Sequence, residues 1–402
     1  MSSDRRAFIT TVVAGSAALA GCSSVLGSPP PGEPPEAGVD EPPDPSRHVF
    51  GANGDWSSFG CNAANTRAVA DGSAPVDGVS ERWRVEVTET TFHAPVVANG
   101  LVFQVESGDT LRVFDSADGA EQWRLEDINA VPVVRDGVAY VPVMKTMYAL
   151  DAETGDQLWD REFERRGSVT GPSMGGGRRL LCGVGEHIVS LDPEDGAIQW
   201  ERKLFGRVID HPAYHMVSNV AVTTEAGIVY LFRESGTGLW QWDLPSPTMS
   251  PLTIGRDSIY VSCRNGETYA LQVSDDRSLD PLWTVDIGWT DRGIAVVDGI
   301  MFASTIRGLH AFETDSGDRR WKRDTGDWRH TAPAYGRDTV FVGGDRLYAF
   351  DPDPGSSLRS GPALRFDREF AGRVGPGPVL DDGALYVVAE VEADRYALLA
   401  LE

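Results

Sequence analysis

The 402-residue sequence predicts an all-β fold built from repeated four-stranded antiparallel units. Tryptophans recur 36 to 43 residues apart, and self-similarity at such a period indicates a repeat architecture. Short β-branched and aromatic runs alternate with Gly-rich turns, and no window of useful length shows a helical period of 3.6 residues. The recurring tryptophans are Trp83, Trp123, Trp159, Trp200, Trp240, Trp283 and Trp321, and Phe366 stands where an eighth is expected.

Each period contains four candidate strands in the same order. One period reads "AVPVVRDG", then "VAYVPVM", then "MYALDA", and ends with the turn and strand "TGDQLW". The first run carries a Pro in most periods, the second and third are rich in Val, Ile, Tyr and Phe, and the fourth ends at the tryptophan. Four short strands joined by polar and Gly turns are expected to form one sheet per period.

The two ends of the repeat region complete one another. The last period, Val374–Glu402, has three candidate strands, and the first tryptophan strand, Glu81–Val87, has no three strands before it. Seven whole units and this shared unit predict an eight-bladed β-propeller, closed by the N-terminal strand pairing with the C-terminal blade. A linear stack is the competing geometry, but it would leave edges that need capping units, whereas a ring has none.

The stretch "MYALDAETGDQLW" explains how neighbouring units are expected to join. Asp151 ends the third strand and can accept hydrogen bonds from turn amides, and Gly155 can adopt the backbone angles of a tight turn. Trp159 begins the outer strand and is expected to pack flat against the next blade, where an aromatic side chain buries roughly 150–250 Å². The motif is therefore predicted to be a packing device.

Two segments precede the repeat and are not expected to belong to a blade core. Residues 1–22 pair Arg5 and Arg6 with a short apolar run and end in "LAGC", which resembles a twin-arginine export signal with a lipobox and predicts lipidation of Cys22. A simply cleaved signal is the alternative. Residues 23–50 are expected to form a Pro-rich acidic tether, and residues 51–402 are expected to form the propeller domain. The first part of that domain, the leader 51–69, is expected to cross one face or the closing blade.

The charge excludes some partners. The chain has 60 acidic and 36 basic residues, a formal net charge of −24, which opposes binding to nucleic acid or anionic lipid. Only Lys145, Lys203 and Lys322 are lysines, and this composition is similar to that of haloarchaeal proteins, in which molar salt screens the repulsion among carboxylates. The cysteines Cys61, Cys182 and Cys263 are too few and too far apart for a disulfide framework and are expected to be buried thiols.

The repeat resembles that of a known family. Ala149-x-Asp151-x-x-Thr154-Gly155-x-x-x-Trp159 and the leader "DWSSFGCNAANTR" resemble the pyrroloquinoline-quinone (PQQ)-like β-propeller proteins, over residues 51–402. The resemblance implies a propeller fold similar to that of the bacterial outer-membrane assembly factor. The dehydrogenases of the family use adjacent cysteines, calcium ligands and an Asp base, and this chain has no Cys-Cys pair and no residue that can be matched to that base or those ligands.

Polar residues just before each innermost strand are candidate site residues because they should meet at one mouth of the central channel. This set can form a funnel for a ligand or a partner loop, or it can consist of solvated loop ends. A metal site at the three histidines requires that the ring bring them together. The candidate funnel residues are His93, Asp210, His211, Asp291, Arg292, His330 and Arg373.

We therefore expect a non-catalytic lipoprotein, exported and held on the outer face of the cell membrane through Cys22, that acts as a protein-binding or scaffolding propeller. Its expected partners are other membrane or surface proteins, it is expected to be monomeric, and no nucleic acid or cofactor is expected. The alternatives are a PQQ-dependent oxidoreductase, which would need PQQ and calcium, and a solute-binding propeller.

Overall fold

The fold was analysed in a computed structural model. It describes residues 55–69, 73–88, 92–128, 130–164, 167–175, 179–215, 219–248, 250–273, 279–326, 330–354 and 361–402. The predicted export signal with Arg5 and Arg6, the lipid site Cys22 and the tether 23–50 lie outside these residues. Within them, no helix has the length and apolar character needed to cross a membrane.

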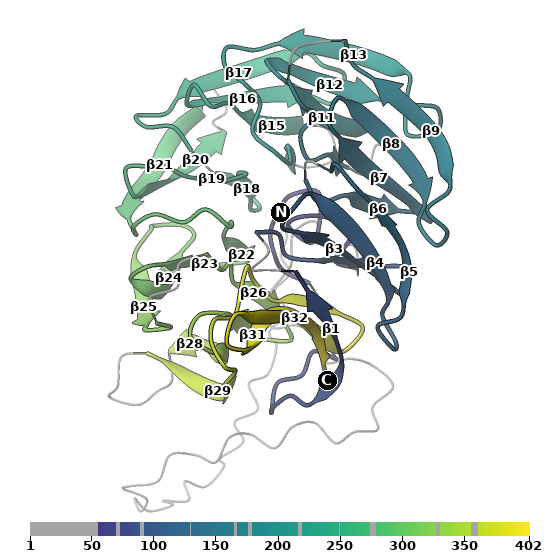
Figure 1. Cartoon of the computed structure of the whole chain (residues 1–402). Coiled ribbons are helices and arrows are strands. Elements are labelled where there is room, and N and C mark those ends of the chain that lie inside the picture. The colour runs from purple at the N-terminus through teal and green to yellow at the C-terminus, as the bar shows by residue number, and fades with distance from the viewer. Residues whose placement is uncertain are drawn as a thin grey trace, which may run out of the picture. The chain divides into compact units, whose positions relative to one another are not determined.

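Eight four-stranded antiparallel sheets form a β-propeller ring (Figure 1). We number the sheets as blades 1 to 8 in the order of their innermost strands. Blade 1 comprises β2 Val96–Ala98, β3 Leu101–Glu106, β4 Thr110–Asp115 and β5 Glu121–Leu125. Blade 2 comprises β6 Val133–Arg135, β7 Val138–Val143, β8 Thr146–Asp151 and β9 Gln157–Glu162. Blade 3 comprises β10 Ser173–Met174, β11 Leu180–Val184, β12 His187–Leu191 and β13 Ile198–Lys203. Blade 4 comprises β14 Ala213–His215, β15 Asn219–Thr223, β16 Ile228–Arg233 and β17 Gly238–Asp243.

The other half of the ring repeats this order. Blade 5 comprises β18 Thr253–Ile254, β19 Ser258–Ser262, β20 Glu267–Val273 and β21 Leu279–Asp286. Blade 6 comprises β22 Ala295–Val297, β23 Ile300–Thr305, β24 Gly308–Glu313 and β25 Arg319–Arg323. Blade 7 comprises β26 Ala334–Gly336, β27 Thr339–Val342, β28 Leu347–Pro354 and β29 Pro362–Arg368. Blade 8 comprises β30 Val379–Asp381, β31 Ala384–Glu392, β32 Arg395–Leu401 and, as its outermost strand, β1 Glu81–Val87.

Blade 8 is completed by the N-terminal strand, as the sequence predicts. β1 pairs antiparallel with β32, with Val85 opposite Leu398. Just before β1, Ser80 and Glu402 exchange two backbone hydrogen bonds of 2.7 and 2.9 Å. The prediction of eight four-stranded blades closed by the N-terminal strand is therefore confirmed.

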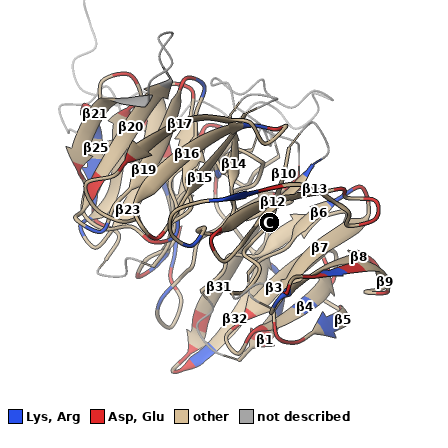
Figure 2. Ribbon diagram, turned by 90° about the horizontal axis from the view of Figure 1, so that it is seen from above, with Lys and Arg blue, Asp and Glu red and all other residues tan. Residues whose placement is uncertain are grey.

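Burial follows the position of each strand within its blade. β3 and β23 are buried along their whole length because each blade is covered on both faces by its neighbours. The outermost strands β9 and β13 are largely exposed. Charged residues accordingly lie on outer strands such as β5 and β25 and in the turns (Figure 2). The apolar core is thus divided among the contacts between successive blades.

The recurring tryptophans occupy one register position. In every blade with a tryptophan strand, the tryptophan stands opposite a small or aliphatic residue of the third strand, next to a register shift. Phe366 takes this position in blade 7, opposite Ala349, as the spacing predicts. Cys61, Cys182 and Cys263 are buried free thiols.

Candidate functional site

The leader, residues 55–69, lies against the inner edge of the ring. An innermost strand has no neighbouring strand on the side of the central channel, so its backbone amides that face the channel need hydrogen-bond acceptors. The leader carbonyls accept hydrogen bonds of 2.7–2.9 Å from innermost strands of six blades. The pairs are Val97 to Trp56, Val134 to Ser57, Tyr214 to Ala63, Ile254 to Ala64, Val296 to Thr66 and Tyr335 to Arg67. The leader therefore fills the interior of the ring, and the sequence-based placement across one face or the closing blade alone is wrong.

Arg67 fixes the leader in place. Its guanidinium donates to Pro333 O at 2.8 Å, to Phe59 O at 3.3 Å and to Pro378 O at 3.1 Å, and it lies over the ring of Trp56 at 5.0 Å. Burial lowers the pKa of Arg67 to about 10. A guanidinium is suited to this position because its rigid fork of donors can reach several carbonyls at once. The sequence indicates none of these partners of Arg67, although "NTR" belongs to the leader signature that resembles the family.

We call the end of the ring at which the chain enters the innermost strands the funnel face. His93, Asp291 and His330 lie there, in the segments that lead into β2, β22 and β26. The imidazole Nδ1 of His330 lies 2.7 Å from Asp291 Oδ2, so blades 6 and 7 are joined by a charge-assisted contact. The ring of Trp289 meets that of His330 edge-on, with centroids 6.3 Å apart.

Arg292 connects blade 6 with blade 1. Its guanidinium carbon lies 5.1 Å from the centroid of the Phe92 ring, a cation–π contact, and its Nε lies 3.7 Å from Asp291 Oδ1. Burial lowers the pKa of His93 to about 4, with the positive charge of Arg292 acting in the same direction and Asp210 opposing it. Side chains of blades 1, 4 and 6 therefore come close enough to influence one another.

Asp210 and His211 form the part of the site contributed by blade 4. Asp210 Oδ1 accepts a hydrogen bond of 2.7 Å from Gly171 N, and His211 Nδ1 lies 3.2 Å from Pro172 O. The His211 ring stacks on Phe59 of the leader, with centroids 4.7 Å apart. Burial lowers the pKa of His211. The leader thus forms the floor beneath this side of the mouth.

The contacts above bring together six of the seven candidate funnel residues, which we call the funnel cluster: His93, Asp210, His211, Asp291, Arg292 and His330. Arg373 stands at the corresponding position before β30, and its side chain is exposed. Among the described residues, no group of three His, Cys, Asp or Glu side chains is placed to hold a metal ion. The possibility of a metal site at the three histidines is therefore not supported.

A polar groove runs beside the funnel cluster. It has a volume of about 430 Å³ and follows the entry segments of blades 2 to 5. That volume lies within the range of small-ligand pockets, although the groove is mostly polar rather than apolar. Its lining includes Asp109, Ser168, Arg207, Asp210, Thr248 and Arg264.

Large apolar side chains are exposed around the same mouth. Phe205 is 73% exposed and Phe92 56%, and Met144 and Ile306 are similarly open. All four lie in funnel-face segments or turns. The other exposed large apolar residues of the described chain lie on outermost strands, namely Leu158, Ile198, Leu282 and Leu364. Exposed apolar side chains are thus found on the funnel face and on the outer rim of the ring.

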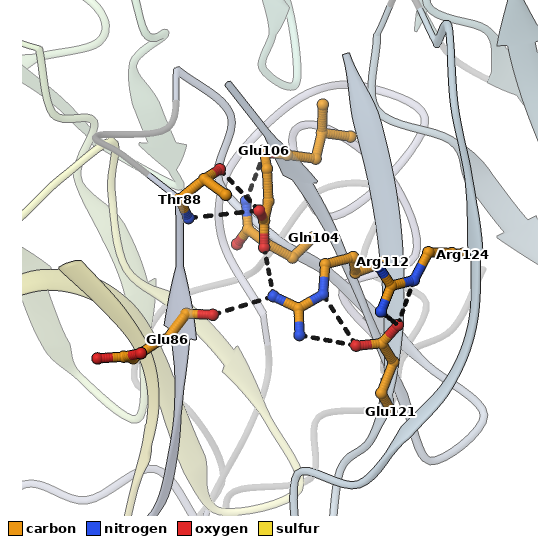
Figure 3. Close-up of polar contacts among 8 residues, drawn as sticks. Glu86, Thr88, Gln104, Glu106, Arg112, Glu121 and Arg124 are labelled. Atoms are coloured by element: carbon orange, nitrogen blue, oxygen red, sulfur yellow. Dashed lines mark hydrogen bonds and ion pairs between the residues drawn. The ribbon is translucent and has the colours of Figure 1, made fainter. Parts of the chain in front are cut away.

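A polar network joins blade 8 to blade 1 close to the funnel (Figure 3). Arg112 donates to Glu86 O at 2.9 Å, to Glu106 Oε1 at 2.7 Å and to Glu121 Oε2 at 2.7 and 3.0 Å. Glu106 also accepts from the Thr88 hydroxyl at 2.8 Å. Two residues earlier on β3, the amide of buried Gln104 donates to His93 O at 3.1 Å. The closing seam and the channel mouth therefore both use polar side chains of β3.

The predicted docking residues lie at the blade boundaries. Six tryptophan indoles donate to a backbone carbonyl of the next blade at 2.8–3.0 Å. The donor–acceptor pairs are Trp83 to Ser116, Trp123 to Ala152, Trp159 to Pro193, Trp200 to Glu234, Trp283 to Thr314 and Trp321 to Pro352. Trp240 lies on β17 opposite Leu231. Asp151 Oδ1 accepts from Thr154 N at 2.9 Å, a bond that lowers the pKa of this carboxyl. These residues build the ring and do not line the mouth.

Comparison with known proteins gives both kinds of relative that the repeat suggests. A family model described as "Outer membrane protein assembly factor BamB" matches residues 75–144, 185–288, 273–358 and 308–402. Outer membrane protein assembly factor BamB of Yersinia pestis is 26% identical over 245 residues, which span 53% of this chain and 60% of that protein. Quinohemoprotein alcohol dehydrogenase ADH-IIG of Pseudomonas putida is 21% identical over 313 residues, spanning 69% of this chain and 40% of that one.

Solved structures share the fold. Quinohemoprotein alcohol dehydrogenase from Comamonas testosteroni superposes with a TM-score of 0.68 at 13% identity, over 86% of this chain and 80% of that one. BamB from Moraxella catarrhalis gives 0.62 at 13% identity, over 80% of this chain and 100% of that one. At this identity the likeness concerns the fold alone, and the chain matches less than two thirds of the length of either curated relative.

Proposed function

This chain belongs to the family described as outer membrane protein assembly factor BamB, and from that premise we propose that it is a non-catalytic lipoprotein that binds or scaffolds other proteins. The "LAGC" sequence supports an anchor at Cys22 on the outer face of the cell membrane, and Arg5 and Arg6 support export in the folded state. The acidic, Lys-poor composition supports a halophilic cell. The expected partners are membrane or surface proteins and not nucleic acid.

The observation that carries the proposal is the exposure of Phe205, Phe92, Met144 and Ile306 on the funnel face. These four side chains come from four blades but face the same end of the ring, and exposed apolar and aromatic residues contribute most to protein-binding surfaces. The ring beneath them is held by the leader, which is bonded to six blades. The funnel face can therefore present these side chains in fixed positions, which lowers the entropic cost of binding.

The main alternative is a PQQ-dependent oxidoreductase, which the two quinohemoprotein relatives favour. The described residues do not fit PQQ and calcium well. Calcium takes six to eight oxygen ligands, and no described group of three acidic, His or Cys side chains is placed for a metal. The interior of the ring also holds the leader with buried Arg67. This arrangement favours binding over redox chemistry.

Site-specific crosslinking on whole cells tests the proposal. A photo-crosslinking residue is placed at Phe205 and, as the matched control, at Leu158, which is 55% exposed on the outermost strand β9. We expect one defined surface protein to be captured from position 205 and not from 158, and a second-site change Phe92→Ser to reduce that capture. Equal capture from both positions contradicts the assignment of the funnel face.

The alternative is tested on the same natively exported protein. Its absorption spectrum and mass are recorded before and after PQQ and calcium are added, and turnover of alcohols is measured. We expect no quinone absorbance and no turnover. Bound or titratable PQQ with turnover of an alcohol would overturn the non-catalytic proposal.

A further inference from the structure

Arg292 is a largely buried cation of the funnel cluster with an unpaired donor. Only 18% of its side chain is exposed. Its Nε is buried and has no hydrogen-bond partner, and the nearest carboxylate oxygen, Asp291 Oδ1, lies at 3.7 Å, beyond hydrogen-bond distance. Asp291 Oδ1 is itself buried and without a hydrogen-bond partner. Buried polar groups are nearly always paired, so this guanidinium calls for an acceptor in addition to Asp291.

The contact with Phe92 holds the guanidinium beside an exposed aromatic ring. The guanidinium carbon lies over the Phe92 ring at 5.1 Å, and Phe92 is exposed at the channel mouth. A guanidinium carries five N–H donors in its own plane, in a fork that includes parallel pairs. Two parallel donors match the two oxygens of a carboxylate.

Each neighbouring acidic group already has a partner at one of its two oxygens. Asp291 Oδ2 is in contact with His330 Nδ1 at 2.7 Å, and Asp210 Oδ1 accepts from Gly171 N at 2.7 Å. Their negative charge still opposes an incoming anion, and this opposition grows with the charge of the ligand. A singly charged carboxylate group is therefore favoured over a doubly charged phosphate at this single guanidinium.

We propose that the channel mouth is a carboxylate-binding site in which Arg292, held against Phe92, receives the carboxylate of a small organic acid or the carboxylate that ends a partner polypeptide. The site goes beyond the scaffolding role and does not depend on it, because a free organic acid requires no partner protein. The leader supplies the floor, since a Cβ on Gly293, next to Arg292, would lie 3.6 Å from Phe59 and from Arg67.

Isothermal titration calorimetry on the whole folded protein tests the site. The probes are acetate, lactate, inorganic phosphate, and one tetrapeptide with a free or an amidated C-terminus, at constant ionic strength in chloride. We expect saturable binding of a carboxylate probe in the millimolar range, at least tenfold tighter than phosphate. Binding of acetate or lactate without peptide binding assigns a small organic acid, and binding of the free but not the amidated peptide assigns a polypeptide terminus.

Three variants make the test specific. Arg292→Gln should abolish binding, and Phe92→Leu, which keeps the guanidinium but removes its aromatic support, should weaken it severalfold. Arg84→Gln, at an arginine of β1 whose side chain is 56% exposed, is the matched control and should leave it unchanged. The proposal is overturned if the parent protein binds none of the carboxylate probes, if phosphate binds as tightly, or if Arg292→Gln, shown to be folded by its circular dichroism, binds as the parent does.

Discussion

The indole of Trp123 in blade 1 lies directly on Gly155 in blade 2. A Cβ added to Gly155 would come within 2.8 Å of the indole Cδ2, and the indole Nε1 donates to Ala152 O at 3.0 Å in the same turn. Gly155 has a φ of +76°, which favours glycine, and its lack of a Cβ leaves room for the indole. The Thr-Gly turn of one blade is therefore the surface on which the previous blade docks.

Gly155→Ala should destabilise the ring more than backbone strain alone explains. Gly137 has a φ of +79° but no atom within 4 Å of the position of an added Cβ, so Gly137→Ala reports the strain of a left-handed residue, about 1 kcal/mol. Gly155→Ala adds overlap with a packed aromatic ring, about 2 kcal/mol more. Equilibrium unfolding in denaturant measures both variants, and equal losses contradict ring contact as the reason for glycine.

Replacing Trp123 separates the indole hydrogen bond from the packing of its ring. Trp123→Phe removes the donor to Ala152 O and should cost about 1 kcal/mol, whereas Trp123→Ala should cost about 3–5 kcal/mol because a large side chain is lost. Leu158→Ala on the exposed face of β9 is the control and should change stability by less than about 0.5 kcal/mol. Similar losses for Trp123→Ala and Leu158→Ala would show that the docking contact contributes little.

The ring could be predicted because its determinants are local and repeated. Each period carries its own strands, its turn glycine and its tryptophan, and spacing alone indicates Phe366 as the equivalent residue of blade 7, where it stands opposite Ala349. Ring closure followed from counting strands at the two ends. Repetition thus turned a weak local signal into a firm assignment of fold.

The interior of the ring could not be predicted in the same way. Arg67 reaches Pro333 and Pro378, 266 and 311 residues further along the chain, and nothing near "NTR" in the sequence indicates those partners. The funnel residues were found by their place before each innermost strand, but the particular contacts of Arg292 with Phe92 depend on side-chain directions across the channel. Contacts that occur once, between distant segments, leave no periodic trace.

Arg67→Met should destabilise the protein by about 3 kcal/mol or more. The change removes the donors to Pro333 O, Phe59 O and Pro378 O and leaves buried carbonyls without partners. Arg67→Lys should recover little, since one ammonium cannot reproduce the fork. Arg84→Met, at an arginine whose side chain is 56% exposed, is the control and should be nearly silent. Thermal unfolding at fixed salt measures all three, and a silent Arg67→Met contradicts the role of the leader in holding the ring.

Arg112 should be required for a stable seam between blades 8 and 1. Arg112→Met leaves the Glu106 carboxylate, of which 4% is exposed, without its cation and should cost about 3 kcal/mol. Adding Glu106→Gln should restore part of that loss, because the buried charge is removed. Arg307→Met breaks an exposed pair with Asp286 and should cost less than about 1 kcal/mol. A double variant no more stable than Arg112→Met contradicts the explanation by an unpaired charge.

His310 should make the protein less stable as the pH falls from about 6.5 to 4. It is buried on β24, and burial lowers its pKa to about 4, with the positive charges of Lys322, Arg319 and Arg307 acting in the same direction. In the unfolded chain a histidine titrates near pH 6.5, so between these values the unfolded state binds more protons and the free energy of unfolding falls with pH. The stabilisation is complete above pH 6.5.

His310→Gln should remove this part of the acid sensitivity. Denaturant unfolding of the parent and the variant is compared at pH 7 and pH 4 in the same salt. Because one pKa unit corresponds to about 1.4 kcal/mol, the loss of stability on acidification should be smaller in the variant by on the order of 2–3 kcal/mol. His93, His211 and His215 also have lowered pKa values and remain in both proteins, so their contribution cancels in the comparison. Parallel losses in the two proteins would show that His310 is not held neutral by its surroundings in the folded state.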